Sequence, residues 1–334
     1  MENTELLTIL SSPKRIVITT HKNPDGDAMG SSLALYQYLT LKGHNALVIT
    51  PNEYPDFLDW LPGNSAVKNA KDIPQFAKDR IAEAEVIFCL DFNTLNRIDQ
   101  LAEPVEQSTA YKVLIDHHQQ PQPFDFMFHR VEASSTCQLV FEFIDMLGDK
   151  AMINKDIASC LYTGIMTDTG SFKFPSTTAT VHRIIADLIE AGAENSAIHR
   201  NVFSAYTANR LKLLGHCIGE KLTVIPEKAT AYITLGKEEL KKYSFQPGDT
   251  EGIVNYPLDI KGIKLSVIFI EREDGIKISF RSVGKFSVNQ FSRANFGGGG
   301  HDNAAGGQSS LTLQQTVEKF VTLLDTYANE IINS

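Results

Sequence analysis

The amino-acid sequence predicts an α/β domain with a parallel sheet sandwiched by helices, joined by a helical linker to a smaller α+β domain with a mixed sheet. Three observations lead to this prediction. Short apolar runs alternate with helical patterns in the first part of the chain, strand patterns follow one another closely near its end, and 334 residues exceed the usual size of one compact core. We therefore expect two domains, 1–210 and 211–334, the first of which includes the connecting helix.

The first domain is expected to contain four buried strands, because four short apolar runs are bounded by polar segments. These runs are RIVITTH at 15–21, ALVIT at 46–50, VIFCLDF at 86–92 and KVLIDHH at 112–118. Helical spacing follows the first run as far as Gly43, and further helices are expected at 134–148, at 154–168 after an Asn154 cap, and at 177–192. Alternation of this kind is typical of a parallel sheet that is covered on both faces.

The second domain begins after a polar stretch, 194–220, whose scattered apolar residues predict the connecting helix. Strands are expected in ATAYITLG, IKLSVIFIER and GIKISFRS, and an amphipathic helix from about residue 311. A glycine cluster at 297–300 is the only compositionally biased stretch.

Composition excludes several classes of function. A net charge of −9 argues against binding of long duplex nucleic acid, which relies on a basic face. No apolar run approaches membrane-spanning length and the N-terminus lacks a secretion signal, so we expect a cytoplasmic protein that does not associate with membranes. The four cysteines are widely spaced without a CxxC pair, which indicates neither a thiolate zinc site nor disulfides.

The first candidate site residues lie in the turn between a predicted strand and a predicted helix, where open α/β sheets bind ligands. A proline and a glycine within HKNPDGD favour a tight turn that would bring His21, Asp25 and Asp27 together. Convergent carboxylates suggest a cation. An Asp-rich helix cap is the alternative, whereas an EF-hand fails because two apolar residues follow where oxygen ligands belong.

Further candidates stand at the ends of apolar segments. Asp91 follows one strand, Asp116, His117 and His118 end another, and Asp168 ends a helix, where the macrodipole disfavours negative charge. If these side chains share one crevice with the first group, they can hold a pair of divalent cations. Oxygen-rich ligation with imidazole favours Mn²⁺, and Mg²⁺, Fe²⁺ and Zn²⁺ are alternatives.

The motifs HKNPDGD, the Asp91 strand, DHH at 116–118 and GIMTDTG match, in order, those of the DHH phosphoesterase superfamily. FGGGGHDNAAGG at 296–307 resembles the substrate-binding motif of the DHH-associated domain in the branch that contains bifunctional oligoribonucleases (nano-RNases) and pAp phosphatases. The resemblance implies metal ligands and catalytic residues. It implies that His21, Asp25 and Asp91 bind one metal, that Asp27, Asp91, His117 and Asp168 bind the other, that His118 lies near the scissile phosphate, and that Asp116 orients a neighbouring imidazole.

Substrate contacts are expected in the second domain. Backbone amides of Gly298, Gly299 and Gly300, together with His301, are candidates for gripping a phosphate, although a flexible hinge is the alternative for the cluster. Arg281 is the best candidate for clamping a terminal phosphate, and a strand arginine can equally be a solvated surface residue. Two other candidates are Arg293, and more weakly Arg130 in the first domain.

The resemblance implies hydrolysis of short oligoribonucleotides to mononucleotides and of adenosine 3′,5′-bisphosphate (pAp) to AMP. Two cations roughly 4 Å apart would activate a hydroxide for this reaction. A cyclic-dinucleotide or linear dinucleotide phosphodiesterase is the alternative, and a family II pyrophosphatase or a RecJ-type exonuclease ranks lower. A nucleotide-sensing binding module without turnover is the hypothesis from a different class. The expected partners are short RNA or small phosphorylated nucleotides, and a homodimer is one assembly that the sequence allows.

Overall fold

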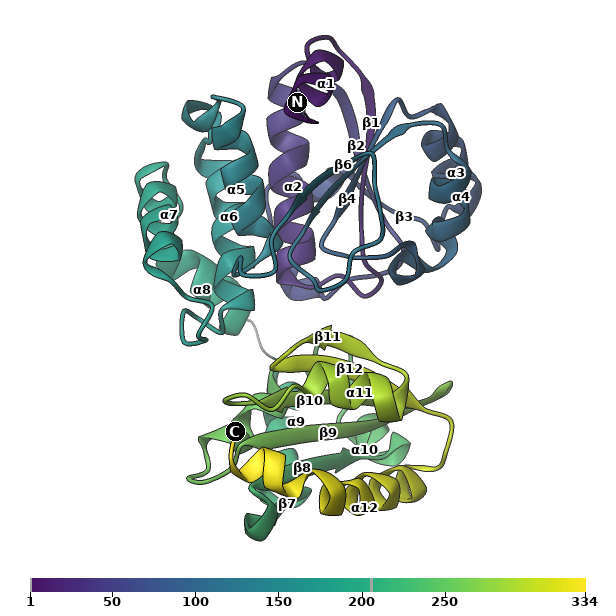
Figure 1. Cartoon of the computed structure of the whole chain (residues 1–334), viewed down its shortest axis with the longest axis vertical. Helices are drawn as coiled ribbons and strands as arrows, with labels where there is room; N and C mark the ends of the chain where they lie inside the picture. Colours follow the sequence, from purple (N-terminus) through teal and green to yellow (C-terminus); the bar gives the residue numbers. More distant parts are fainter. Residues whose placement is uncertain (1, 205–206) are drawn as a thin grey trace. The chain divides into compact units, whose positions relative to one another are not determined.

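A computed structural model describes residues 2–204 and 207–334 of the chain (Figure 1). These residues form two compact units, Met1–Ala205 and Tyr206–Ser334, which are described separately below. The division lies close to the predicted boundary at residue 210, and the assignment of catalysis to one unit and substrate binding to the other stays a prediction. In place of one connecting helix the structure has two, α8 (Asn195–Phe203) and α9 (Ala208–Gly219).

The first unit contains a six-stranded sheet in which every neighbouring pair of strands is parallel. Its strands, in spatial order, are β3 (Val67–Asn69), β2 (Asn45–Thr50), β1 (Arg15–Thr20), β4 (Val86–Leu90), β5 (Tyr111–Asp116) and β6 (Phe126–His129). The parallel sheet and the four predicted strands are confirmed. The two edge strands, β3 and β6, were not predicted, because three and four residues are too few for a clear alternating pattern.

Helices cover both faces of this sheet, as Figure 1 shows. One hydrophobic core lies between the sheet and α2 (Gly26–Leu41), α5 (Thr136–Met146), α6 (Lys155–Asp168) and α7 (Ala179–Glu190), and α1 (Glu2–Leu10) also contributes to it. A second core lies on the other face under α3 (Pro74–Glu83), the 3₁₀ helix η3 (Leu95–Leu101) and α4 (Ala102–Gln107). The Asn154 side chain caps α6 as predicted.

The strand order places a topological switch point between β1 and β4. From β1 the chain moves outward to β2 and β3, and it then returns to the other side of β1 with β4 and β5. The loops that leave β1 and β4 therefore run in opposite directions and leave a crevice at the carboxyl ends of these strands. His21 and Asp91 directly follow the register pair Thr20–Leu90, so the fold brings both to this edge.

The second unit contains a mixed sheet, as predicted. Its strands, in spatial order, are β11 (Gly299–His301), β12 (Ala304–Ser309), β10 (Gly275–Ser282), β9 (Leu265–Arg272), β8 (Thr230–Leu235) and β7 (Leu222–Ile225). Only β8 and β9 pair in parallel. One face packs on α11 (Val288–Phe296) and α12 (Leu313–Ile332), and the other packs on α9, α10 (Lys237–Lys242) and the 3₁₀ helix η6 (Ile253–Asp259).

All four cysteines are buried and unbonded to one another. Among residues 2–204 and 207–334, no helix has both the length and the apolar character needed to cross a bilayer.

Candidate metal centre

A first group of possible metal ligands forms at the carboxyl ends of β1 and β4. The Nε2 atom of His21 lies 3.4 Å from Oδ2 of Asp91 and 3.9 Å from Oδ2 of Asp25. One ligand atom from each of the three residues can be chosen so that all lie within 4.8 Å of one another. Asp25 also caps α2, since its Oδ1 accepts hydrogen bonds from the Asp27 and Ala28 amides. The helix cap and the candidate ligand are therefore two roles of one carboxylate.

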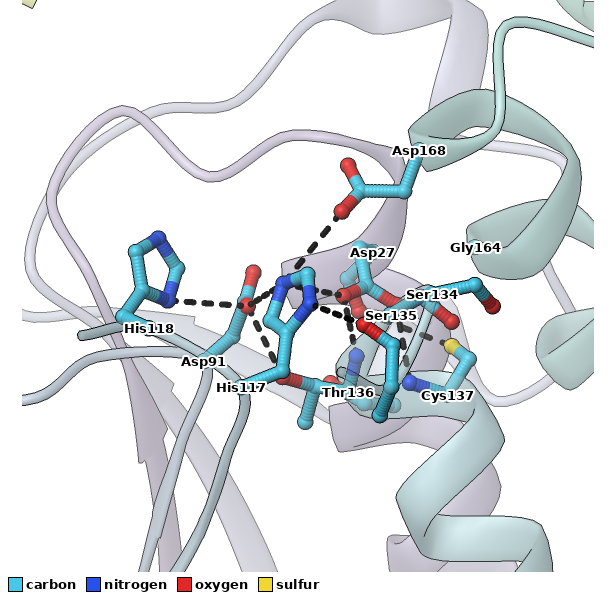
Figure 2. Close-up of polar contacts among 12 residues, drawn as sticks. Asp27, Asp91, His117, His118, Ser134, Ser135, Thr136, Cys137, Gly164 and Asp168 are labelled. Atoms are coloured by element: carbon cyan, nitrogen blue, oxygen red, sulfur yellow. Dashed lines mark hydrogen bonds and ion pairs between the residues drawn. The ribbon is translucent and has the colours of Figure 1, made fainter. Parts of the chain in front are cut away.

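A second group forms beside the first from Asp27, His117 and Asp168. The Nε2 atom of His117 lies 3.8 Å from Oδ2 of Asp27, 3.3 Å from Oδ2 of Asp168 and 3.5 Å from Oδ1 of Asp91 (Figure 2). The two oxygens of Asp91 thus face different histidines, Oδ2 toward His21 and Oδ1 toward His117. The backbone of Asp91 has a φ of 62°, an unfavourable conformation for a residue other than glycine and one that concentrates at functional sites.

The donor chemistry of both groups fits divalent cations. Nδ1 of His21 lies 2.8 Å from the Lys22 carbonyl, and Nδ1 of His117 lies 3.1 Å from the Ala133 carbonyl. A carbonyl only accepts hydrogen bonds, so each Nδ1 carries a proton, and the Nε2 atom that faces the carboxylate oxygens can bind a metal when the ring is neutral. A cation between these atoms would be bound by the Nε2 atoms and the carboxylate oxygens. Imidazole and carboxylate donors without a thiolate suit Mn²⁺, Mg²⁺, Fe²⁺ or Zn²⁺.

The acidic groups strongly shift one another's pKa values in the metal-free protein. Burial, followed by the charge of Asp91, raises the pKa of Asp27 to about 7. Burial, followed by the charge of Asp27, raises the pKa of Asp168 well above its usual range. Burial opposes ionisation of Asp91 as well, but its contacts with His117 and His21 prevail and hold its pKa well below the usual value. Such closely packed buried carboxylates require compensating positive charge.

The three residues of the DHH sequence, Asp116, His117 and His118, make different contacts. His117 belongs to the second ligand group, whereas Nδ1 of His118 lies 2.8 Å from Oδ1 of the fully buried Asp116. His129 on the neighbouring strand β6 donates to the His118 carbonyl over 2.7 Å, and its Nε2 lies 4.0 Å from Oδ2 of Asp116. Burial is the main reason that the pKa of His118 lies below its ordinary value, which favours the neutral ring.

The amino end of α5 holds two of the carboxylates. The Thr136 amide donates to Oδ2 of Asp27 over 2.6 Å, and the Cys137 amide donates to Oδ1 over 2.8 Å. The Thr136 hydroxyl donates to Oδ1 of Asp91 over 2.8 Å (Figure 2). The exposed amides and the dipole of a helix amino end favour negative charge, so α5 fixes the position of Asp27 and favours its ionised form.

The loop that carries His21 and Asp25 is fixed from two sides. The Asn23 amide donates to Oδ1 of Asn52 over 2.7 Å, and Nδ2 of Asn52 donates back to Oδ1 of Asn23 over 2.8 Å. Asn23 has a φ of 53°, which asparagine tolerates better than most residues. On the other side the Lys22 amide donates to the Arg97 carbonyl over 2.8 Å. The loops after β2 and β4 therefore position the loop after β1.

The predicted substrate residues lie in the second unit on β10, β11 and α11. Arg281 is half-buried on β10, and Nε of Arg293 on α11 donates to Oδ1 of Asn289 over 2.9 Å. Gly299, Gly300 and His301 pair with β12 as an ordered edge strand. Gly298 must be glycine, because a Cβ there would lie 1.8 Å from the Gly306 carbonyl oxygen. Arg130, the weaker candidate in the first unit, forms an ion pair of 2.8 Å with Glu142.

Sequence reasoning named all six proposed metal ligands, and it missed three residues that position them. These are Thr136, Asn52 and Gly164, of which the last lies where α6 approaches Asp27. Ser135 and Thr136 carried a usable signal, since a serine or threonine before an apolar helix is a typical cap. Gly164 begins the GIMTDTG motif, but no role was given to it. Asn52 carried no signal, because its contacts join segments that are distant in the sequence.

Two family models match the chain in the order of its two units. Residues 15–165 match the DHH family, N-terminal domain, and residues 229–330 match the DHHA1 domain.

Individual relatives cover nearly the whole chain. The bifunctional oligoribonuclease and PAP phosphatase NrnA of Thermus thermophilus is 31% identical over 318 residues, which make up 94% of this chain and 90% of that protein. The crystal structure of an exopolyphosphatase-related protein from Bacteroides fragilis has a TM-score of 0.94 and 40% identity, and the match covers 99% of this chain and 97% of that one. The cyclic-di-AMP phosphodiesterase PdeA of Listeria monocytogenes is 24% identical over 339 residues, which are 96% of this chain and 49% of that protein.

Proposed function

This chain belongs to the DHH family, and on that premise we propose that it is a metal-dependent phosphoesterase with two related activities. It hydrolyses short oligoribonucleotides to mononucleotides, and it hydrolyses adenosine 3′,5′-bisphosphate to AMP. The observation that carries the proposal is the place of Asp91, whose two oxygens face His21 and His117 at 3.4 and 3.5 Å. The name of the Thermus thermophilus relative supports the choice of substrates. Short RNA and nucleoside bisphosphates arise inside cells, so the proposal includes a cytoplasmic location.

The proposal assigns the six buried or half-buried ligands to two cations, with Mn²⁺ as the preferred ion. His21, Asp25 and Asp91 hold one cation, and Asp27, Asp91, His117 and Asp168 hold the other. When bound, such a pair supplies Lewis acidity that lowers the pKa of water and offsets the negative charge that builds on a phosphoryl group. The amides of Thr136 and Cys137 orient Asp27 for this task and favour its ionised form.

His118 and Asp116 act on the substrate side of this centre. Asp116 accepts a hydrogen bond from Nδ1–H of His118, so a neutral His118 ring presents an Nε2 lone pair. The lowered pKa, caused mainly by burial, keeps the ring in this form near neutral pH. We therefore assign His118 the role of accepting a hydrogen bond or a proton beside the scissile phosphate, with Asp116 as the residue that orients it.

The second unit supplies the substrate-binding residues of the proposal. The backbone at Gly298, Gly299 and Gly300 has no side chain that would keep a phosphate away. His301, Arg281 and Arg293 add donors to the same end of the unit, because β11 follows α11 directly and His301 shares the register partner Ala304 with Arg281. Contacts remote from the reacting bond can set substrate length and preference.

The test is a substrate panel with purified protein and Mn²⁺. We expect mononucleotide release from di- and trinucleotides and phosphate release from pAp, and we expect Asp91→Asn to remove all turnover while circular dichroism and the melting temperature stay close to wild type. Asp145→Asn, an exposed aspartate of α5, is the matched control and should keep wild-type rates. Near-normal rates for Asp91→Asn would contradict the assignment of Asp91 to both cations.

A cyclic-dinucleotide phosphodiesterase is the second candidate, and the similarity to PdeA of Listeria monocytogenes favours including it. Because this chain aligns with only 49% of that protein, the same panel decides between the two activities. A higher kcat/KM for cyclic di-AMP than for dinucleotides and pAp would make the second candidate the main activity. Tight binding of every nucleotide without turnover would instead identify a sensor.

A further inference from the structure

One face of the second sheet carries polar and positive side chains across β10, β12 and β11. Residues that lie directly opposite each other in an antiparallel pair share a face, as do alternate residues of one strand. The register pairs that define this face are Lys277 with Gln308, Ser279 with Gly306, Arg281 with Ala304, and Ala304 with His301. Lys277 therefore stands on the same face as Arg281 and His301, two residues of the proposed substrate site.

Within the second unit, the apolar sheet residues of this face end at β9, although η6 also contacts β10. Ile268 and Ile270 of β9 pack against Leu213 and Cys217 of α9 and against residues of α10 and η6. Lys277 is the register partner of Ile270, one strand farther from this cover. The side chains of Lys277 and Gln308 are exposed, and Ser279 and Arg281 are half-buried. The face thus changes from a hydrophobic core to a polar surface between β9 and β10.

Among the described residues, three lysines of the second unit form ion pairs, and Lys277 does not. Lys221 pairs with Glu239, Lys228 with Asp325, and Lys237 with Glu273. In the part of the chain that the structure describes, Lys277 has neither an ion pair nor a side-chain hydrogen bond. A lysine without an ion pair beside a proposed phosphate site, in a protein with a net charge of −9, is suited to an anionic ligand.

We propose that Lys277 determines substrate length: it binds a phosphate of a short single-stranded RNA that lies farther along the strand than the phosphate bound by Arg281. This inference rests on the proposed function and names a substrate class within it. Four residues of an extended strand separate the two Cα atoms by about 13 Å. A mononucleotide bisphosphate that Arg281 holds by one phosphate ends close to that residue. A longer oligonucleotide has further phosphates that can follow the strand toward Lys277.

The experiment compares Lys277→Ala with wild type on pAp, a dinucleotide and a trinucleotide, each with a 5′-phosphate. We expect kcat/KM for the trinucleotide to fall about fivefold to tenfold, mainly through KM, and kcat/KM for pAp to stay within about twofold, as for loss of one charge-assisted contact. The slope of log kcat/KM against log salt concentration should become shallower by about 0.7 for the trinucleotide, the change expected for one lost phosphate contact with a single strand. Lys277→Arg should restore both values.

Lys241→Ala is the matched control, because Lys241 is also exposed, lies on α10 away from β10, and has no side-chain ion pair or hydrogen bond among the described residues. It removes the same charge and should change neither length preference nor salt slope. Equal losses on pAp and trinucleotide, or no loss on either, would overturn the role of Lys277. If the wild-type protein hydrolyses none of the substrates, the proposed phosphoesterase function is wrong. If it hydrolyses them and Lys277→Ala behaves like wild type, only the role of Lys277 is wrong.

Discussion

A Cβ atom on Gly164 of α6 would lie 2.7 Å from Oδ1 of Asp27 and 3.0 Å from its Cα on α2. It would also lie 2.2 Å from Sγ of Cys137, the residue whose amide binds the same carboxylate. Gly164 therefore permits the close approach of α2, α5 and α6 that gives Asp27 its place in the metal centre. Glycine is needed here for space, since its φ is not positive.

We expect Gly164→Ala to displace Asp27 and to lower Mn²⁺ affinity by about 10- to 100-fold, as loss of a group that orients a metal ligand does. Overpacking should also cost about 1–3 kcal/mol of unfolding free energy. Titration calorimetry and urea denaturation measure the two effects. Gly215→Ala on α9 is the control, because a Cβ there meets no atom within 4 Å, and it should be neutral or stabilising. Unchanged Mn²⁺ affinity for Gly164→Ala would show that Asp27 tolerates the displacement.

The part of the site that could be predicted from the sequence is the part that follows from parallel strands. Asp91 and Asp116 end or follow buried strands, and the carboxyl ends of such strands share an edge, so their convergence with His21 was foreseeable. The convergence of Asp27 with Thr136 was not, because 109 residues separate them and only helix packing joins them. The edge strand β6 was missed for a related reason. Its pairing with β5 defines it, and the order of its own apolar and polar residues does not.

The metal-free protein should become less stable as pH rises from about 4 to about 7. Burial and Asp91 raise the folded-state pKa of Asp27 from its ordinary 3.8 to about 7, so its protonated form stabilises the fold below pH 4 and that contribution is lost toward pH 7. Each such group changes the unfolding free energy by at most about 1.4 kcal/mol per pH unit. Asp168, whose pKa is raised by burial and by Asp27, adds to the loss.

Histidines act in both directions. The pKa of His118 is lowered, mainly by burial, so its contribution to stability increases as pH rises toward 6.5 and offsets part of the loss. Burial opposes protonation of His117, but contact with Asp91 raises its pKa well above the usual value, so its stabilisation is also lost as pH rises. The lowered pKa of Asp91 acts in the opposite direction only at more acidic pH, because its stabilisation disappears as pH falls through that low value. Urea denaturation in EDTA at several pH values measures the effect, and saturating Mn²⁺ should remove it. A rise in metal-free stability between pH 4 and 7 would contradict the compact acidic cluster.

Removal of the Asn52 side chain should weaken metal binding without unfolding the sheet. Asn52→Ala deletes both hydrogen bonds to Asn23, of 2.7 and 2.8 Å, and so releases one side of the loop that carries His21 and Asp25. We expect Mn²⁺ affinity to fall about tenfold, and kcat at saturating Mn²⁺ to recover most of its wild-type value, because the ligands themselves remain. Asn201→Ala on α8, whose side chain has no hydrogen bond among the described residues, should change neither quantity. A loss of kcat that excess Mn²⁺ does not repair would mean that Asn52 contributes to the reaction by another route than ligand position.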